Sequence, residues 1–594
     1  MSRPALKPPA PGDRRDEMPM STPSAPDRRR PAPAALQGRG AAPVPGRRAP
    51  ARTALAAALS SALVPALALL LGACGGDGAP EEPPPPEPRG IVFVVIDTLR
   101  ADHVGLYGNE RGLTPRLDAL GAEGLVFDNT VAVSSWTRPS VASMFTGRYP
   151  TVIDVQTKQD ILAPQLETVT ELLKGHGLRT LAISTNGNAG KAFGFDQGFD
   201  EWVHKLPKHG YDSDQFKKVQ GETVTTKALE MLDALPAEEP FFLFLHYIDP
   251  HDPYLPRPEF VDASAVGGRY DGSRTQLQQL DRLGPNLRTP EDVARIRELY
   301  AGEVAYGDHW LGELLDGLRE RALYDESLVI VTSDHGEGLW DHGMRAHGFD
   351  LYEEQLRVPL VVKFPADRQV APRRVTTFAS LVDLAPTMLG VFNLPVPESW
   401  QGRDLGLAER EGKLERRGVF AYSEMDFTGI DLESVSNGEQ KIIRDRAYDG
   451  DKAEAFDYVT VKDDTVDKIS RKLFGRVPHV REIYELNADM LGPKEGGPID
   501  RSTPLEVGLV LRMPPRKMPR DRDKFEWYLL KKDPGELEDL SATEEGRSTK
   551  MHEVLRHLAA ENLARRIEGG QVALEDLDEE TVAELRALGY IGGN

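Results

Sequence analysis

The sequence predicts an α/β protein built on a doubly wound, mostly parallel β-sheet. Short apolar runs, rich in β-branched and aromatic residues, alternate with longer stretches of helical character. These runs are residues 91–96, 178–183, 241–245, 328–332 and 358–362. Runs without polar alternation are typical of parallel strands, which helices cover on both faces. We expect the domain with this pattern to span residues 90–410.

One helix between two of these strands has clear end signals. Thr289 is the predicted N-cap, Pro290 stands in the first turn, and Asp292 lies three residues after the cap. An apolar stripe follows at helical spacing, formed by Leu299, Leu311, Leu314, Leu315 and Leu318. We therefore expect a structural helix that packs on the sheet.

Beyond about residue 410 the chain becomes more charged and less periodic. We expect a smaller C-terminal α+β subdomain over residues 411–545, which includes the strand-turn motif "FEWYLLKKDPGELEDL". Residues 546–594 are expected to form a helical tail that ends in the amphipathic stretch "LDEETVAELRALGYI".

The composition bounds the class of protein. With 594 residues, 40% of them hydrophobic and 28% charged, the chain is long enough for a large core and has ordinary globular usage. The formal net charge of -22 argues against a general nucleic-acid binder, because such proteins need basic surface to neutralise phosphates. The sequence leaves the oligomeric state open.

The N-terminal region has the layout of an export signal. Arginine-rich sequence precedes the apolar segment 54–72, and small residues lead to Cys74 in "LALLLGAC". Cys74 is the single cysteine, so no intramolecular disulfide can form. Residues 1–73 are thus a predicted signal region with an Arg/Pro-rich extension, and Met18 or Met20 are alternative starts.

The string "LGAC" resembles a bacterial lipobox, which implies cleavage before Cys74 and lipidation of its thiol. The proline-rich stretch 74–89 is then an extended linker. We expect a lipid-anchored, extracytoplasmic protein of the bacterial cell envelope that contacts the membrane through its anchor. A simple transmembrane anchor is the alternative, because the apolar segment approaches the length that spans a bilayer.

Three clusters rich in Asp and His follow predicted strands. They are "DTLRADHVGLYG" after 91–96, "HYIDPHDPY" after 241–245, and "SDHGEGLWDHGMRAHG" after 328–332. One such Asp is more often a helix cap or a turn former. Three clusters at the carboxyl ends of strands, where α/β sheets bind ligands, predict a divalent metal site of carboxylates and imidazoles.

The stretch "SSWTRPSVASMFTGRYP", residues 134–150, has the shape of a nucleophile turn that leads into a helix. Its candidate hydroxyls belong to Ser134, Ser135, Thr137 and Ser140. An unassisted hydroxyl is a poor nucleophile at neutral pH and needs a base or a metal ion. This stretch alone does not select one of the four.

Together these motifs resemble the sulfatase family of the alkaline phosphatase superfamily. "VVIDTLRADHVGLYG", "SSWTRPSVASMFTGRYP", "GFDQGFD", "FFLFLHYIDPHDPY", "VTSDHGEGLWDHG" and "LRVPLVVKFP" occur in the family's order. "LVDLAPTML", "QGRDL" and "LLKKDPGELEDL" extend the match to about residue 540. The resemblance implies a doubly wound sheet, a divalent metal, and a covalent intermediate on the residue two before a proline.

Carried over residue by residue, the resemblance assigns the site. Asp97, Asp334 and His335 look like metal ligands. Thr137 falls at the nucleophile position and is expected to contact the metal as a fourth ligand. Mn²⁺, Zn²⁺ and Ca²⁺ are candidates, although a histidine ligand disfavours Ca²⁺. A second metal held by Asp249, His251 and His347 is conceivable.

The same resemblance suggests a substrate shell. His251, His347 and Asn186 are expected to face the substrate, and either histidine could protonate a departing alkoxide. Arg138 and Lys191 could contact anionic oxygens. His246 and His342 are weaker candidates for the site, and Ser135 and Ser140 are expected to hold the turn.

The departures from the family pattern bear on the reaction. Sulfatases carry Cys or Ser, converted to formylglycine, within Cys/Ser-x-Pro-x-Arg, whereas this chain has Thr137 and, at the arginine position, Val141. Threonine cannot become formylglycine. Thr98 also replaces a second aspartate. The set resembles the threonine-nucleophile branch, which includes phosphodiesterases, phosphoethanolamine transferases and lipoteichoic acid synthases.

This branch favours phosphorus, because a sulfothreonine lacks the hemiacetal exit of formylglycine. We therefore expect a hydrolase or transferase of phosphate or sulfate esters, with phosphate preferred and a small-molecule, glycan or lipid substrate. A sulfatase that uses unmodified threonine is the runner-up. A non-catalytic module that binds anionic glycans or lipids is the alternative of another class, and the complete nucleophile and ligand set argues against it.

Overall fold

The computed structural model describes residues 88–587 except for 208–217, 283–287, 411, 413–419, 428–429, 447–455, 461–464, 475–479, 492–503, 507–508 and 514–522. Cys74 and the predicted signal region therefore lie outside the described residues, as does nearly all of the linker. Within the described part of the chain, every helix is too short or too polar to cross a bilayer.

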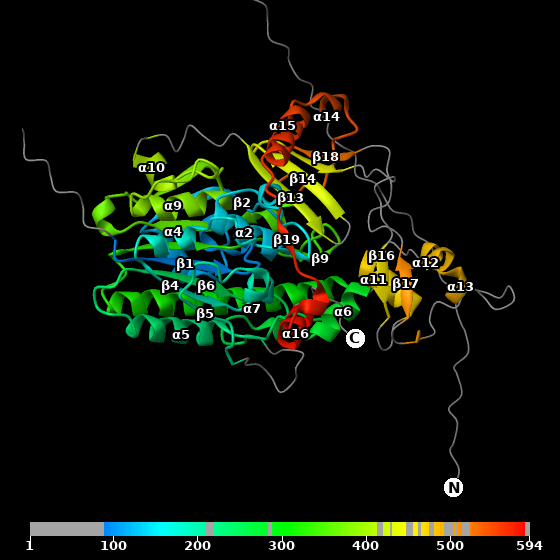
Figure 1. Ribbon diagram of the computed structural model, residues 1–594, viewed down its shortest axis with the longest axis horizontal. Helices are drawn as coiled ribbons and strands as arrows, with labels where there is room; N and C mark the ends of the chain where they lie inside the picture. The colour runs from blue at the N-terminus through cyan, green and yellow to red at the C-terminus, as the bar shows by residue number, and fades with distance from the viewer. Residues whose placement is uncertain are drawn as a thin grey trace, which may run out of the picture. The chain divides into compact units, whose positions relative to one another are not determined.

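The fold is organised by a nine-stranded sheet, shown in Figure 1. Five of its strands run parallel in the order β7, β1, β6, β4, β5. Their bounds are Ser327–Thr332, Gly90–Ile96, Phe241–Tyr247, Arg179–Ser184 and Glu201–Val203. The structure confirms the predicted mostly parallel α/β sheet, and four of the five predicted strands lie in this parallel block.

The fifth predicted strand, residues 358–362, differs from the expectation. Pro359 lacks a backbone N–H, and the chain forms β10 (Arg357–Val358) before it and β11 (Leu360–Lys363) after it. β11 runs antiparallel to β7 and to β2 (Leu125–Val131). β2 and its parallel partner β12 (Arg373–Ser380) had no strand prediction.

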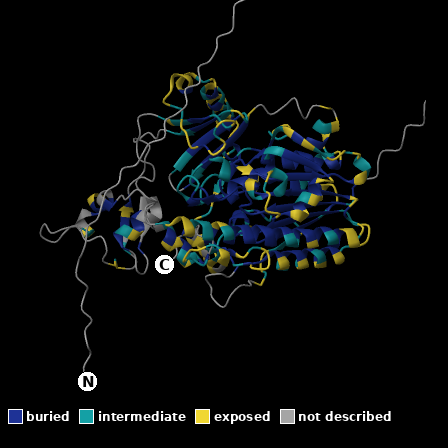
Figure 2. Cartoon of the chain, turned by 180° about the vertical axis from the view of Figure 1, so that it is seen from behind, coloured by how far each residue is buried: buried dark blue, intermediate teal, exposed yellow. Residues whose placement is uncertain are grey.

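Each face of the sheet has its own hydrophobic core, because alternate side chains of a strand point to opposite faces. Ile91, Phe93 and Val95 of β1 belong to one cluster, whereas Val92, Val94 and Ile96 belong to the other. Burying one such side chain fully contributes about 1.5–3 kcal/mol. Figure 2 shows these strands in the colour of buried residues.

Helices cover both faces, as a doubly wound sheet requires. Residues of α2 (Thr137–Thr146), α4 (Val169–Gly175) and α9 (Leu384–Val391) contribute to the first cluster. The second cluster includes residues of α1 (Pro115–Gly121), α5 (Gly221–Asp233) and α7 (Pro290–Glu320), and Figure 1 shows α5 and α7 across the sheet from α4 and α9.

The predicted N-cap of the long helix is confirmed. The Thr289 side chain accepts the backbone N–H of Asp292 at 3.2 Å, and Pro290 opens α7. The Asp292 carboxylate does not return to the cap but accepts Arg269 Nη2 at 2.7 Å. This helix therefore starts with a single side-chain cap and an ion pair to the preceding loop.

A four-stranded antiparallel sheet follows the large sheet in sequence. Its order is β13-β14-β15-β18, with bounds Ala421–Phe427, Ile430–Ser436, Lys441–Asp445 and Lys524–Tyr528. α15 (Met551–Ala564) packs on it through Met551 and Leu555, which share a cluster with Trp527. The first helix of the predicted tail thus covers this sheet.

A further hydrophobic cluster lies between β15 and β18 in sequence. It joins α11 (Val466–Phe474), α12 (Val480–Leu486) and β17 (Val510–Met513), which pairs with β16 (Phe456–Val459). The last elements, β19 (Gly570–Gln571) and α16 (Glu579–Ala587), instead contact β3 (Asp160–Ile161) and the 3-10 turn Gly187–Ala189 of the catalytic domain.

Candidate active site

The site forms where three neighbouring parallel strands end. The register pairs Val95 of β1 with Thr332 of β7 and with His246 of β6. Asp97 and Asp334, each two residues beyond this level, are consequently side by side at one edge of the sheet. This is the edge at which open α/β sheets bind ligands.

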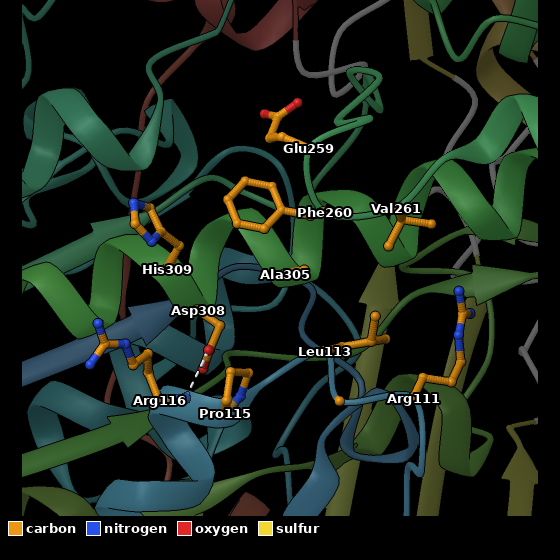
Figure 3. Close-up of a pocket in the computed structure, with 11 residues that line it drawn as sticks. Arg111, Leu113, Pro115, Arg116, Glu259, Phe260, Val261, Ala305, Asp308 and His309 are labelled. Carbon is orange, nitrogen blue, oxygen red and sulfur yellow. Dashed lines mark hydrogen bonds between the residues drawn. The ribbon is translucent and has the colours of Figure 1, made fainter.

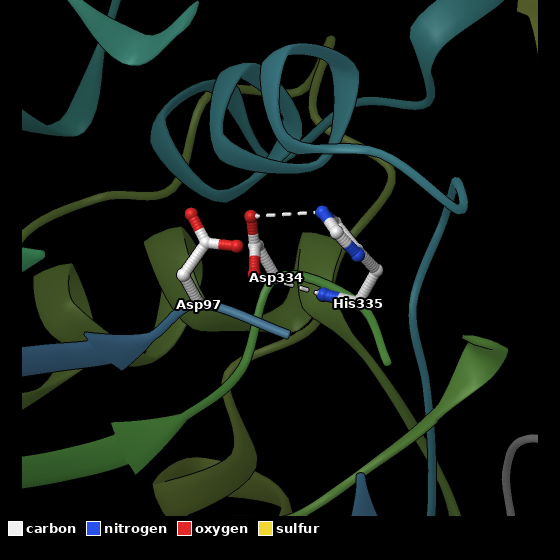
Figure 4. A group of neighbouring side chains, drawn as sticks. All are labelled: Asp97, Asp334 and His335. Atoms are coloured by element: carbon white, nitrogen blue, oxygen red, sulfur yellow. Dashed lines mark hydrogen bonds and ion pairs between the residues drawn. The ribbon is translucent and has the colours of Figure 1, made fainter. Parts of the chain in front are cut away.

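Asp97, Asp334 and His335 form a buried group whose ligand atoms all lie within 4.8 Å of one another (Figure 4). All three are fully buried. Among the described residues this is the one cluster of acidic, His or Cys side chains with such geometry. The structure therefore brings the three predicted ligands together.

The orientation of His335 leaves one ring nitrogen for a ligand. Its Nδ1 lies 2.8 Å from the carbonyl oxygen of Gly336, and because a carbonyl only accepts, Nδ1 carries the proton. Nε2 then presents its lone pair on the side of Asp334 Oδ2, 3.3 Å away. Burial lowers the pKa of His335 below its ordinary value, which favours the neutral, ligating form.

The donor set fits a divalent cation. Asp97 Oδ1 and Asp334 Oδ2 are buried and have no hydrogen-bond partner, although a buried ionised carboxylate is costly unless it is paired or holds a metal. Two carboxylate oxygens and one imidazole nitrogen suit Mn²⁺ or Zn²⁺ better than Ca²⁺, which prefers oxygen alone. Asp97, Asp334 and His335 would hold the ion.

Backbone strain accompanies this group. Thr98, next to Asp97, has a φ of 57°, in the left-handed region that a β-branched residue rarely adopts. Such a conformation costs on the order of 1–3 kcal/mol. Its N–H donates to Asp334 Oδ1 at 3.3 Å, and its carbonyl accepts the hydroxyl of Tyr300 at 2.7 Å. These contacts hold the turn that directs Asp97 toward Asp334.

Thr137 lies at the start of α2, against the same group. Its Oγ1 is 3.3 Å from His335 Nε2 and accepts Asn186 Nδ2 at 3.2 Å. The N-terminus of a helix carries partial positive charge and unpaired N–H groups, which favour an anion. Ser140 and Ser135 do hold the turn, because their hydroxyls donate to the Ser134 carbonyl at 3.1 Å and to Met425 Sδ at 3.1 Å.

Asn186 links Thr137, the predicted nucleophile, to Asp97, a predicted metal ligand. Besides its contact with Thr137, Nδ2 donates to Asp97 Oδ2 at 2.6 Å, and Oδ1 accepts the backbone N–H of Asn188 at 2.9 Å. Asn186 is 1% exposed and follows β4, the strand next to β6. The amide thus has its position set from both ends.

Three comparisons place the chain among known proteins. Residues 89–394, just over half of the 594, match the model of the sulfatase family. The chain belongs to the sulfatase family. Members of this family are ester hydrolases, so the predicted enzyme class is confirmed, and the binding-module alternative finds no support.

Among its relatives, the chain is 26% identical over 347 residues to the ulvan-active sulfatase of Formosa agariphila, a match that covers 55% of this chain and 66% of that protein. Two solved structures are each 18% identical with a TM-score of 0.55. One is a protein in complex with its substrate D-glucosamine-2-N,6-O-disulfate, covering 81% of this chain and 98% of that one. The other, a phosphonate monoester hydrolase of Agrobacterium radiobacter, covers 83% and 98%. At this identity the structures show the fold alone.

His246, a weak candidate from the sequence, lies inside the sulfatase-family site. It is the penultimate residue of β6 and is fully buried, and its Nε2 is 3.2 Å from Asp97 Oδ2. Burial by itself would lower the pKa of His246, but contact with Asp97 and the nearby charge of Asp334 raise it. In the sequence, a histidine within an apolar strand is typical of a core residue. The contact with Asp97 becomes evident only because β6 lies beside β1 in the sheet.

His251, His335 and His347 form a row of imidazoles. The ring centroids of His347 lie 4.3 Å from His335 and 5.0 Å from His251. His347 Nδ1 is 3.2 Å from Glu337 Oε1, and Tyr254 donates to the other oxygen of Glu337 at 3.1 Å. Burial raises the pKa of Glu337 to about 7 and lowers that of His347. Glu337, absent from the sequence predictions, therefore orients His347.

His342, the other weak candidate, lies elsewhere. Its ring stacks on Tyr352 at 3.6 Å, Nδ1 meets Glu354 Oε1 at 2.6 Å, and Nε2 meets the carbonyl oxygen of Glu536 at 3.0 Å. Burial opposes its protonation, but the charges of Glu354 and Glu536 raise its pKa to about 9. His342 ties the loop after β7 to the C-terminal part of the chain.

The hypothetical second metal set of Asp249, His251 and His347 is not formed in the part of the chain that the structure describes. The Asp249 carboxylate has other partners: Lys218 Nζ at 3.3 Å and Arg257 Nη2 at 3.7 Å meet Oδ1, and the N–H of Gly221 meets Oδ2 at 2.8 Å. The same two cations also pair with Glu303, so Asp249 belongs to a buried charge network and not to a group with His251 and His347.

Arg138 and Lys191 do not join the site as predicted. The buried Arg138 guanidinium donates to the carbonyl of Asp160 at 3.1 Å and to the carbonyl and side-chain oxygens of Asn188 at 3.2 and 3.0 Å, and it stacks on Phe193. Lys191 is 69% exposed and pairs with Asp196 at 3.4 Å. Arg138 thus braces neighbouring loops, and Lys191 lies at the surface.

A separate cavity of about 400 Å³ lies between the loop before α1 and helix α7 (Figure 3). None of the predicted site residues lines it. At its floor, Asp308 caps α1 by accepting the N–H groups of Arg116 and Leu117 at 2.9 and 2.8 Å. Asp308 is therefore a buried carboxylate with a purely structural role.

Removing one ligand should separate metal binding from folding. We expect Asp334→Asn to lose most bound metal and at least about 100-fold in activity, because its oxygen is one of three donors. The circular dichroism spectrum should stay native, since Asp334 follows a strand end rather than filling the core. Metal content after dialysis and thermal melting with and without added Mn²⁺ or Zn²⁺ measure this.

Asp308→Asn is the matched control, since it alters another buried carboxylate, which lines the separate cavity and caps α1. It should lower the melting temperature and leave the metal content unchanged. Full metal content and turnover in Asp334→Asn would show that the Asp97, Asp334 and His335 group is not the metal site.

Proposed function

We propose that this sulfatase-family chain is a metal-dependent hydrolase of phosphate esters, with Thr137 as its nucleophile. The observation that carries the proposal is the position of Thr137 Oγ1, 3.3 Å from His335 Nε2 and hydrogen-bonded to Asn186, which also holds Asp97. A single hydroxyl therefore faces the donor group at the N-terminus of a helix.

The reaction balances with residues of this chain. Thr137 Oγ1 attacks phosphorus, the bond from phosphorus to the alcohol oxygen breaks, and the alcohol leaves with a proton. Water then attacks the phosphothreonine and releases phosphate. A cation held by Asp97, Asp334 and His335 supplies positive charge that lowers the pKa of a neighbouring hydroxyl.

Two features of the chain support the negative charge of the phosphoryl oxygens, and a third group contacts Asp97. Asn186 donates a hydrogen bond beside the nucleophile, and the start of α2 contributes its partial positive charge. His246 Nε2 lies 3.2 Å from Asp97 Oδ2, and this contact raises the pKa of His246 against the effect of burial. The site is buried, so these charges act with little screening by water.

The threonine favours phosphorus over sulfur. Water can hydrolyse a phosphothreonine, whereas a sulfated threonine lacks the carbonyl hydrate that lets formylglycine expel sulfate. The likeness of the fold to a phosphonate monoester hydrolase is compatible with phosphorus chemistry.

The second candidate is a sulfate ester hydrolase that uses unmodified Thr137. The observation in its favour is the family itself, together with relatives such as the ulvan-active sulfatase. Under either candidate, a small molecule or a glycan that carries the anionic ester is the proposed substrate. Transfer to an alcohol in place of water would make the same intermediate.

Thr137 provides the test between the two candidates. Thr137→Ala should lose at least about 1,000-fold in rate, whereas Thr137→Ser should keep part of it because the oxygen survives. Acid quenching during turnover of a phosphate monoester, followed by peptide mass spectrometry, should find a phosphate-sized mass on the peptide with Thr137. Ser140→Ala, which changes a hydroxyl one helical turn away, is the control.

A sulfate-sized mass from a sulfate ester, with phosphate esters left untouched, would instead establish the second candidate. A phosphate on Ser135 or Ser140 would overturn the assignment of the nucleophile.

We also propose that His347, oriented by Glu337, donates the proton to the leaving alkoxide. His347→Ala should then slow esters of alkyl alcohols by about 100-fold or more and nitrophenyl esters much less, because nitrophenolate leaves without a proton. His251→Ala, measured in parallel, assigns the role between the two rings. Equal slowing of both ester classes by His347→Ala would remove it as the proton donor.

The proposed location is the outer face of a bacterial membrane, with Cys74 lipidated after signal cleavage. This proposal rests on the "LGAC" string and the proline-rich linker that follows it. Cys74→Ala should leave the chain uncleaved at this site and without acyl groups, as measured by mass spectrometry of the membrane fraction. A wild-type protein that starts after another residue and carries no lipid would contradict it.

A further inference from the structure

The segment that follows α15, residues 566–587, runs along the catalytic domain, and we name it the C-terminal strap. The backbone N–H of Ile567 donates to the Val152 carbonyl at 2.8 Å, and that of Val572 donates to the Gln159 carbonyl at 2.8 Å. Between them, β19 pairs antiparallel with β3. The strap is therefore fixed to residues 152–161 by backbone hydrogen bonds as well as by side chains.

Its side chains reinforce this pairing at Asp160, which is 4% exposed. Gln571 Nε2 donates to Asp160 Oδ1 at 2.9 Å. The other oxygen of Asp160 accepts the N–H groups of Gln156 and Thr157 at 2.8 and 2.6 Å. The carboxylate thus couples the strap to the turn that precedes β3.

This turn holds the residue after the nucleophile. Arg138 donates to the carbonyl oxygens of Asp160 and Thr157 at 3.1 and 3.5 Å, and also to that of Lys158. Arg138 directly follows Thr137, so a shift of residues 157–160 would move Arg138 and, through the backbone, Thr137.

The second part of the strap contacts the turn that carries Asn186. Helix α16 contacts the 3-10 turn Gly187–Ala189, and its Leu585 is 1% exposed within the core. Glu584 lies over Gly187, where an added Cβ would come within 3.1 Å of its carboxyl group. This turn begins at Asn186, the amide that contacts both Thr137 and Asp97.

The two supports meet at Arg138. Its Nη2 donates to Asn188 Oδ1 at 3.0 Å, and its Nε donates to the Asn188 carbonyl at 3.2 Å. One guanidinium therefore links the turn at residues 157–160, which the β19 segment contacts, with the turn at residues 187–189, which α16 contacts. The strap contacts both turns, although it is more than 400 residues away from Thr137 in sequence.

From this arrangement we infer that the C-terminal strap is a positioning element of the active site, which sets the geometry of Thr137 and Asn186. It acts through the turns at 157–160 and 187–189 and does not touch the substrate. Displacing reacting groups by about 1 Å can cost about 100-fold in rate, so bracing these turns has a kinetic effect. The inference rests on the proposed role of Thr137.

Two variants test it. One chain ends after Arg565, which retains α15 and removes the strap. The other is Leu585→Asp, which places a charge in the core under α16 while keeping the strap's length. Leu563→Asp is the matched control, because Leu563 lies on α15 with 57% of its surface exposed.

Both variants should lower kcat by at least about 10-fold with KM changed less than about threefold, because positioning acts on the reacting groups more than on binding. Peptide 566–594 added to the truncated chain should restore part of kcat. An irreversible loss of the fold would not be reversed in this way. The control should match the wild type. Unchanged or increased kcat in both variants would overturn the inference.

Hydrogen exchange gives a readout that does not depend on the nucleophile. Both variants should exchange faster at residues 137–146 and 186–193, while β1 and β7 keep wild-type protection. If Thr137→Ala remains active, the proposed function fails, yet exchange still tests the strap. If the truncated chain does not fold, Leu585→Asp decides the outcome. Unchanged hydrogen exchange in that variant would refute the positioning role.

Discussion

The arrangement of the site depends on two buried carboxylates that face each other at the ends of adjacent parallel strands. Asp97 follows β1 and Asp334 follows β7, and each keeps a buried oxygen without a hydrogen-bond partner. Like charges in a medium of low dielectric repel strongly, so this geometry is stable only with positive charge between or beside them. The neighbouring groups are consistent with that requirement.

Several of those groups would otherwise be poor choices for a protein interior. Thr98 adopts a left-handed backbone, and His246 is a fully buried imidazole in an apolar strand. Each is explained by Asp97: Thr98 turns the chain so that the carboxylate faces Asp334, and the Nε2 atom of His246 lies 3.2 Å from the Asp97 carboxylate. Strain and buried charge are concentrated at the residues proposed to bind the metal, as expected where function opposes stability.

The loops around this centre are fixed by buried polar contacts more than by apolar packing. Arg138 uses its donors on carbonyl oxygens from two turns, and Asp249 shares Lys218 and Arg257 with Glu303 beside the segment that carries His251. Breaking a buried pair by removing one partner commonly costs about 3–5 kcal/mol. Such networks therefore hold the loops around Thr137 in one arrangement, which the proposed reaction requires.

The sequence by itself determined the fold class, and it pointed to the group of Asp97, Asp334 and His335 and to Thr137 beside it. Runs such as 91–96, apolar at every position, are typical of strands buried on both faces, and the resemblance to sulfatases placed Asp97, Asp334 and His335 after such strands. These features are local, because each depends on residues within one strand and the turn that follows it.

Only the tertiary structure decided which other polar residues join them. Arg138 and Asp249 looked like site residues, but their charges are taken up by groups from distant segments, whereas His246 and Glu337 enter the site because β6 and the loop after β7 lie beside β1. The strap could not be foreseen either, since residues 566–587 reach the nucleophile's supports only through long-range pairing. The chemical role of a charged side chain depends on the groups that it contacts. Those contacts come from elements that are far apart in the sequence and that only the packing brings together.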